Sequence, residues 1–147
     1  EVRNISLNRR IVATLDTAKT FCLQSTNVIN LKPGVELDIA YLLGVLNSTA
    51  VNYFFRCRFP GNNHIPSNQL LRIPIPIPLS NQTHNRVVKL VKAILNLNGK
   101  LAAAKSEAQK TVIQRQIDAT DAEIDRLVYD LYGLTAKEIA IVEGATE

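Results

Sequence analysis

Between residues 56 and 72 the chain concentrates side chains that can recognise the edges of nucleic-acid bases. Arginine can bond bidentately to guanine, and asparagine or glutamine to adenine. Gly61 and nearby prolines suit a loop that approaches a groove closely. A structural alternative stays open, in which the asparagines shape a turn and the arginines cap a helix end. The candidates are Arg56, Arg58, Asn62, Asn63, His64, Asn68, Gln69 and Arg72.

Three further basic residues, Arg9, Arg10 and Lys19, suit contacts with phosphate better than with bases. They lie in a front half, residues 1–78, with 8 basic and 4 acidic side chains. The chain as a whole has a net charge of +4. The acidic excess is confined to its C-terminal part, since residues 116–147 carry 2 basic and 8 acidic side chains. This distribution favours a polyanionic partner.

No catalytic constellation stands out in the sequence. The glycines are scattered, so there is no phosphate-binding or dinucleotide loop. His64 and His84 have no metal-ligand spacing, and Cys22 and Cys57 form neither a zinc motif nor a disulfide framework. The acidic cluster around Asp121 belongs to a solvated helix face. We therefore expect a chain that binds rather than catalyses, with no metal and no cofactor of its own.

We expect an α+β fold made of two parts. The first, residues 1–78, is a small mixed half that recognises the target. Strands are expected within 9–30, where Ile11-Val12-Ala13-Thr14-Leu15 is rich in β-branched residues. A buried helix is expected over 38–46, and Ser48 is suited to cap the helix that follows.

The second part, residues 79–147, is expected to be helical. The boundary is the alternating sequence Ile73-Pro74-Ile75-Pro76-Ile77-Pro78, which lacks every second N–H and cannot form a central strand. Apolar residues at spacings of three and four run from His84 to Tyr132 in two seams that differ in phase. A turn near 105–109 would fold them into an antiparallel hairpin. A single long helix is the alternative.

The end of the hairpin is marked by standard helix signals. Gly133 is placed to cap its second arm, and Thr135-Ala136-Lys137-Glu138 is a capping box that opens a short last helix. No stretch reaches the roughly 20 apolar residues that a membrane span needs. There is no signal-peptide pattern, and two reduced thiols fit the cytoplasm. The absence of Met favours a piece of a longer protein.

Three stretches of the sequence occur in a characteristic order. They are residues 10–16, then 41–48 with an aromatic helix and, after a loop, 73–76, then 123–135 with Ile139 and 141–143. Together they resemble the C-terminal specificity domain of TaqI-like enzymes, which are type II restriction-modification proteins and related adenine-specific DNA methyltransferases. The layout is also similar to half of a type I specificity subunit.

The resemblance implies a module that recognises double-stranded DNA beside the methyltransferase domain of a parent chain. S-adenosylmethionine would then be bound in that catalytic domain, because the family's catalytic Asn-Pro-Pro-Tyr-type motif and cofactor-binding glycines are absent here. Whether a parent enzyme also cleaves DNA stays open. The alternative function is a helical interaction module that docks a partner or catalytic subunit through the hairpin.

Overall fold

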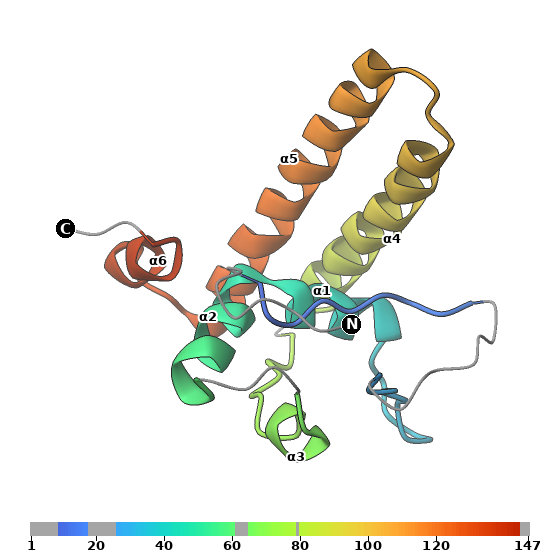
Figure 1. Ribbon diagram of the computed structural model, residues 1–147. Coiled ribbons are helices and arrows are strands. Elements are labelled where there is room, and N and C mark those ends of the chain that lie inside the picture. The colour runs from blue at the N-terminus through green and yellow to red at the C-terminus, as the bar shows by residue number, and fades with distance from the viewer. Residues whose placement is uncertain (1–8, 18–25, 61–64, 79, 145–147) are drawn as a thin grey trace.

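The computed structural model describes residues 9–17, 26–60, 65–78 and 80–144. Within these ranges the chain folds into helices only (Figure 1). The helices are α1 (Ile39–Asn47), α2 (Thr49–Arg58), α3 (Ser67–Leu70), α4 (Asn81–Ala103), α5 (Glu107–Tyr132) and α6 (Ala136–Val142).

The expected α+β class is wrong, because the described residues contain no strand. Residues 9–17 contain no strand, but burial alternates as in a strand over residues 11–16, with Ile11 5% and Val12 53% exposed. Side chains, however, replace a partner strand. The Ile11 N–H donates to Asn52 Oδ1 at 2.7 Å, and Ala13 exchanges two hydrogen bonds with the Asn47 amide. Two asparagines of α1 and α2 thus satisfy backbone groups that would otherwise need a ladder.

Helices α1 and α2 form where the sequence predicts them. Asp38 caps α1 by accepting the Ala40 N–H at 2.8 Å, and α1 is buried from Ala40 to Leu46. Ser48 ends α1 and its side chain then caps α2 by accepting the Val51 N–H. A single serine therefore makes the bend between two helices.

The hairpin expected from the two seams is present, and α4 and α5 pack against each other. The turn falls at Ala104, Lys105 and Ser106, at the start of the range expected for it. Ser106 caps α5 by accepting the Gln109 N–H at 3.2 Å, so a serine cap replaces the glycine or proline that usually marks such a turn. Gly133 adopts φ 66° at the end of α5, and the Thr135–Glu138 capping box opens α6.

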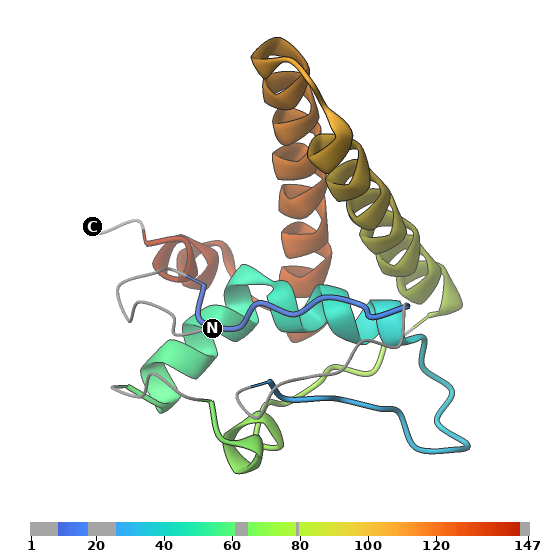
Figure 2. The same ribbon diagram turned by 45° about the vertical axis from the view of Figure 1, so that its right-hand side comes forward.

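One hydrophobic core joins the base of the hairpin to α1 and α2. Gly44 lies at the crossing, where an added Cβ would come within 2.8 Å of Val91 and 3.0 Å of Val87. Ile124 and Val128 of α5 close the core from the other side. Because both halves share this core, the boundary at residues 78 and 79 stays a prediction. Beyond the core the hairpin projects away from the other helices (Figure 2).

Candidate nucleic-acid interface

The C-terminal end of α2 holds two of the candidate arginines against aromatic rings. The Arg56 guanidinium lies 5.7 Å from the centre of the Tyr53 ring, and that of Arg58 lies 5.6 Å from the Phe59 ring. Phe59 is buried and its N–H closes the helix on Phe55 O at 2.9 Å. Stacking on rings that belong to the helix end restrains these long side chains while Arg58 stays exposed.

The single turn α3 presents the remaining described candidates. Asn68 and Arg72 are exposed, and Gln69 is half-buried. Among the described residues, Gln69 Oε1 is a buried acceptor without a hydrogen-bond partner. Turning this amide outward would therefore break no hydrogen bond of Oε1, which suits a side chain that is recruited by a ligand.

Helix α3 is short, but both of its ends are fixed by hydrogen bonds. Asn27, from a distant exposed segment, donates to Ile65 O at 2.8 Å and accepts from Ser67 Oγ at 3.3 Å. At the other end, the Ile73 N–H donates to Leu70 O at 3.1 Å, and Ile73 is only 6% exposed. The turn is therefore a fixed platform rather than a free loop.

The Ile-Pro segment that follows α3 is tied to the hairpin and to α1 by two tyrosines. Tyr41 Oη donates to Pro76 O at 2.8 Å, and Tyr132 Oη donates to Pro74 O at 2.6 Å. Burial raises the pKa of Tyr132 to about 12, so its hydroxyl keeps the proton that it donates. These bonds fix the position of α3 relative to the core.

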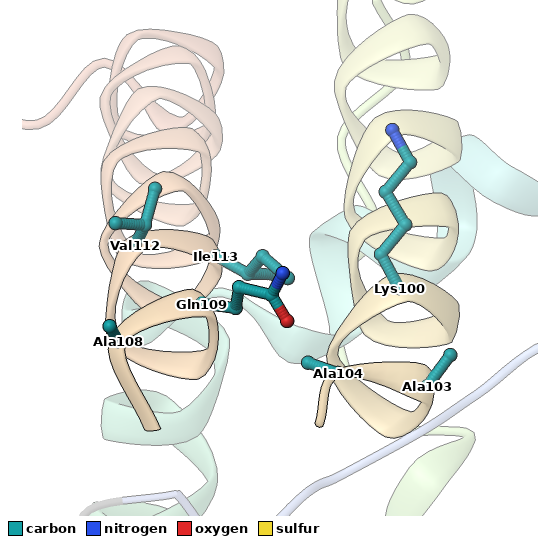
Figure 3. Close-up of a pocket in the computed structure, with 7 residues that line it drawn as sticks. All are labelled: Lys100, Ala103, Ala104, Ala108, Gln109, Val112 and Ile113. Atoms are coloured by element: carbon teal, nitrogen blue, oxygen red, sulfur yellow. The ribbon is translucent and has the colours of Figure 1, made fainter. Parts of the chain in front are cut away.

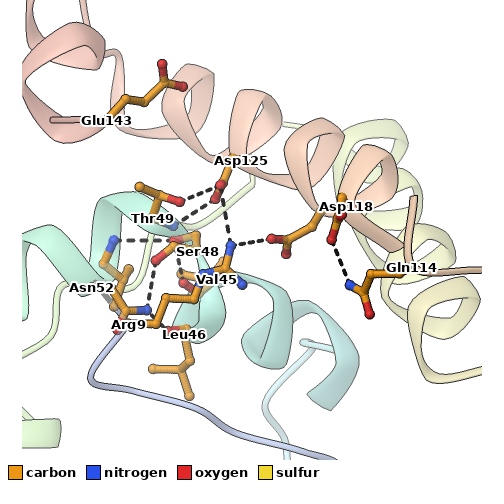
Figure 4. Close-up of polar contacts among 12 residues, drawn as sticks. Arg9, Val45, Leu46, Ser48, Thr49, Asn52, Gln114, Asp118, Asp125 and Glu143 are labelled. Carbon is orange, nitrogen blue, oxygen red and sulfur yellow. Dashed lines mark hydrogen bonds and ion pairs between the residues drawn. The ribbon is translucent and has the colours of Figure 1, made fainter. Parts of the chain in front are cut away.

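Arg9 and Arg10 are held in contacts inside the fold. Arg9 forms ion pairs with Asp121 and, at 3.8 Å, with Asp125 of α5 (Figure 4). Arg10 is only 5% exposed; it donates to Phe59 O at 2.8 Å and lies 5.7 Å from the centre of the Phe55 ring. The structure thus gives both arginines positions that link the N-terminal segment to the helices. Lys19, Asn62, Asn63 and His64 lie outside the described residues.

A match to a known protein family covers half of this chain. Residues 2–75 match the family described as the TaqI-like C-terminal specificity domain. The chain belongs to this family. The matched range contains α1, α2 and α3 and ends within the Ile-Pro segment. No curated protein and no solved structure matches the chain significantly.

Membership makes the chain a specificity domain, a kind of module that recognises DNA in restriction-modification systems and is generally not catalytic.

The distribution of charge in the chain suits that role. No Asp or Glu occurs between Asp38 and Glu107, a stretch that holds α1 to α4 and all of the described candidates except the two N-terminal arginines. Carboxylates of α5 are used within the fold, where Glu123 pairs with Arg86 at 2.6 Å and Asp121 with Arg9. The end of α2 and the turn that follows α3 therefore carry basic side chains without acidic neighbours in sequence.

Several important residues of this specificity domain were missed by sequence reasoning. Asn47 and Asn52 replace a strand. Asp125 was expected on a solvated helix face with the acidic cluster, but its side chain is only 13% exposed and caps α2 through Thr49. Each is an ordinary polar residue on a helix, and only the fold shows what it faces. Asn27 is a similar case, because its partner is 38 residues away. A signal existed only for Asn52, which sits on the apolar side of α2.

The described part of the domain contains no group of three His, Cys, Asp or Glu side chains that could hold a metal ion. None of its helices is long and apolar enough to cross a membrane. His84 lies in the first turn of α4, where its Nε2 accepts the Asp38 N–H at 3.2 Å. Its ring centre lies 5.2 Å from that of Tyr41, so the histidine has a structural position.

Two hollows in the surface of the described residues lie near the hairpin turn, away from α3. One, of about 550 Å³, lies between the ends of α4 and α5 and is lined mainly by small and apolar side chains (Figure 3). The other, of about 760 Å³, is lined by residues such as Asn98 and Arg115. Both are widely open, so they are shallow surfaces rather than enclosed sites for a small molecule.

Proposed function

We propose that this specificity domain binds duplex DNA and reads its sequence through the end of α2 and through α3. The observation that carries the proposal is the exposure of Arg58, Asn68 and Arg72 within a stretch of sequence that has no carboxylate. Arginine and asparagine supply the donors that distinguish guanine and adenine in the major groove. Basic side chains without acidic neighbours attract the phosphate backbone. We add Gln69 to these DNA-reading residues because its side-chain amide oxygen has no hydrogen-bond partner among the described residues.

The proposed biological setting is a type II restriction-modification enzyme. In it, the domain would position an adenine-specific DNA methyltransferase domain on its target. We propose that S-adenosylmethionine is not bound by the described residues of this chain. The three glycines with positive φ, at 34, 133 and 144, lie in separate loops and form no cofactor-binding turn. This separation supports our proposal that S-adenosylmethionine is held by the methyltransferase domain and not by this chain.

The first experiment is a selection from a pool of duplexes with a randomised centre, followed by binding measurements on the selected duplex. Binding should weaken steeply with salt, because phosphate contacts release counterions. Replacing Asn68 or Arg58 with Ala should relax preference at one base position, by about 1–3 kcal/mol. Replacing a side chain that contacts phosphate should instead weaken binding to all sequences alike. It should also lower the slope of log affinity against log salt concentration by about one. Lys105→Ala, at the exposed hairpin turn, is the control and should change neither. Recovery of no duplex at low salt would refute the proposal.

Arg9→Ala and Arg10→Ala complete this series. If these arginines contact phosphate, as the sequence suggests, the two variants should bind every duplex more weakly without a change in stability. As structural contacts with Asp121 and Phe59, they would lower the free energy of unfolding. We propose the second outcome, because the guanidinium of Arg10 is buried.

A second candidate function is supported by the far half of the hairpin. There the seam residues Leu97, Leu101, Ile113 and Ile117 are only half-buried, and Val112 is 55% exposed. We propose this surface as the side that docks a partner or catalytic domain. Removing residues 79–147 would not test it, because Val87 and Ile124 belong to the shared core. Val112→Asp is the sharper variant: it should disrupt assembly with a methyltransferase domain while leaving DNA binding intact.

A further inference from the structure

Leu71 is the most exposed apolar residue of the proposed DNA-binding surface. Its side chain is 86% exposed, although it follows directly after the half-buried Leu70. The backbone at this point is fixed, because the Leu71 N–H donates to Ser67 O at 3.1 Å and the Arg72 N–H to Gln69 O at 3.1 Å. The exposure of Leu71 is therefore a property of the folded turn, and the side chain is presented at a set position.

The surroundings of Leu71 indicate what could cover it. Two exposed polar residues, Asn68 and Arg72, lie three positions before it and one after it. Asn27 bonds to the start of α3, and Val28 and Ile29, which follow it in the chain, are 63% and 41% exposed. Leu71 and Arg72 lie in the stretch of sequence without carboxylates, and an exposed apolar side chain beside a basic one matches a surface that is apolar inside and anionic outside. Stacked base pairs between two phosphate backbones have this composition.

Resting on the proposed function, we propose that Leu71 inserts as an apolar wedge against a base-pair step of the bound duplex, between the contacts of Asn68 and Arg72. Leucine is among the side chains that minor-groove-binding proteins insert between base steps, which partly unstacks the step and kinks the DNA. The same unstacking would here come from the groove that Asn68 and Arg72 contact. The wedge adds a sequence requirement of its own, because flexible pyrimidine–purine steps unstack most easily. Leu71 would thus contribute to specificity without a hydrogen bond to any base.

The test compares Leu71→Ala with Ile77→Ala on the selected duplex. Ile77 is also 86% exposed but lies beyond the described contacts of α3, so it is matched in exposure and in chemistry. Affinity is measured by fluorescence anisotropy, and bending by energy transfer between dyes at the two duplex ends. We expect Leu71→Ala to weaken binding about tenfold and to abolish the bend. Leu71→Phe, which keeps an apolar wedge, should retain both, and Ile77→Ala should behave as the unchanged chain.

A second duplex, with a mismatch at the selected step, separates a wedge from a simple surface contact. Because the mismatch removes part of the unstacking cost, the unchanged chain should bind it more tightly than the paired duplex, and Leu71→Ala should lose that preference. Equal affinity and bending of Leu71→Ala and the unchanged chain would overturn the wedge and leave the proposed function standing. Equal losses in the two alanine variants would also overturn it and point to a protein contact. If the unchanged chain binds no duplex at all, the proposed function fails first.

Discussion

The Asp125 carboxylate of α5 accepts two hydrogen bonds from Thr49, one from its N–H at 2.8 Å and one from its hydroxyl at 2.5 Å (Figure 4). Thr49 is the first residue of α2, so a residue 76 positions later in the chain caps the helix that carries Arg56 and Arg58. Burial raises the pKa of Asp125, and the bonds from Thr49 act in the opposite direction. The link makes the proposed DNA-binding surface dependent on the base of the hairpin.

Asp125→Ala should therefore destabilise the whole fold. It removes both acceptors of Thr49, and losses of this kind cost about 2 kcal/mol. Urea denaturation followed by circular dichroism measures the change. Asp130→Ala, an exposed acidic residue of the same helix, is the matched control and should change stability by less than about 0.5 kcal/mol. Equal effects of the two variants would mean that the cap contributes nothing.

Gly44 and Gly99 both lie inside helices, and the same substitution should have opposite effects on them. At Gly44 a methyl group would meet Val91 at 2.8 Å, so Gly44→Ala should destabilise by about 1–3 kcal/mol before the better helix propensity of alanine offsets part of it. At Gly99 an added methyl group would meet no other described part of the fold within 4 Å, so Gly99→Ala should stabilise by about 0.5–1 kcal/mol. Thermal denaturation checks both signs. A gain in melting temperature for Gly44→Ala would show that the crossing of α1 and the hairpin is loose.

Burial along the hairpin predicts a gradient in tolerance of charge. Ile124 is 3% exposed, so Ile124→Asp should cost several kcal/mol and unfold the chain. Ile94 is half-buried, so Ile94→Asp should cost less, and Val112→Asp, at 55% exposure, should cost almost nothing. Melting temperatures of the three variants measure the order. Unchanged melting of all three would mean that the seams are not buried.

The cap of α1 predicts a loss of stability in acid. The hydrogen bond from the Ala40 N–H lowers the pKa of Asp38, and so does Lys92, whose Nζ lies 3.3 Å from the Asp38 carboxylate. Partial burial acts in the opposite direction. Because the folded-state pKa lies below the unfolded value, this contribution is present above about pH 4 and is lost as the pH falls through the folded-state pKa. The stability difference between the unchanged chain and Asp38→Asn should thus be largest at pH 7 and shrink toward pH 2. Glu36→Gln, an exposed neighbour, is the control; a difference independent of pH would contradict the prediction.

The elements that the sequence predicted correctly depend on local signals. Ser48, Gly133 and the Thr135–Glu138 box mark helix ends through bonds to residues within one turn, so a reader of the sequence can find them. The two seams likewise predict the hairpin, because the periodicity of apolar residues reports the buried face of each helix. The order of motifs was enough to suggest the family, and the match over residues 2–75 confirms it.

Only the tertiary structure decided which side chains hydrogen-bond to backbone groups and which charged side chains form ion pairs within the fold. Residues 11–16 have the alternation of a strand, and no local signal shows that Asn47 and Asn52 of two helices take the place of a partner strand. In the same way, no local signal shows that Arg9 pairs with Asp121, which lies 112 positions away in the chain. Hydrogen bonds and ion pairs act over a few ångströms in space. Their partners are therefore fixed by how helices pack, which composition and periodicity do not record.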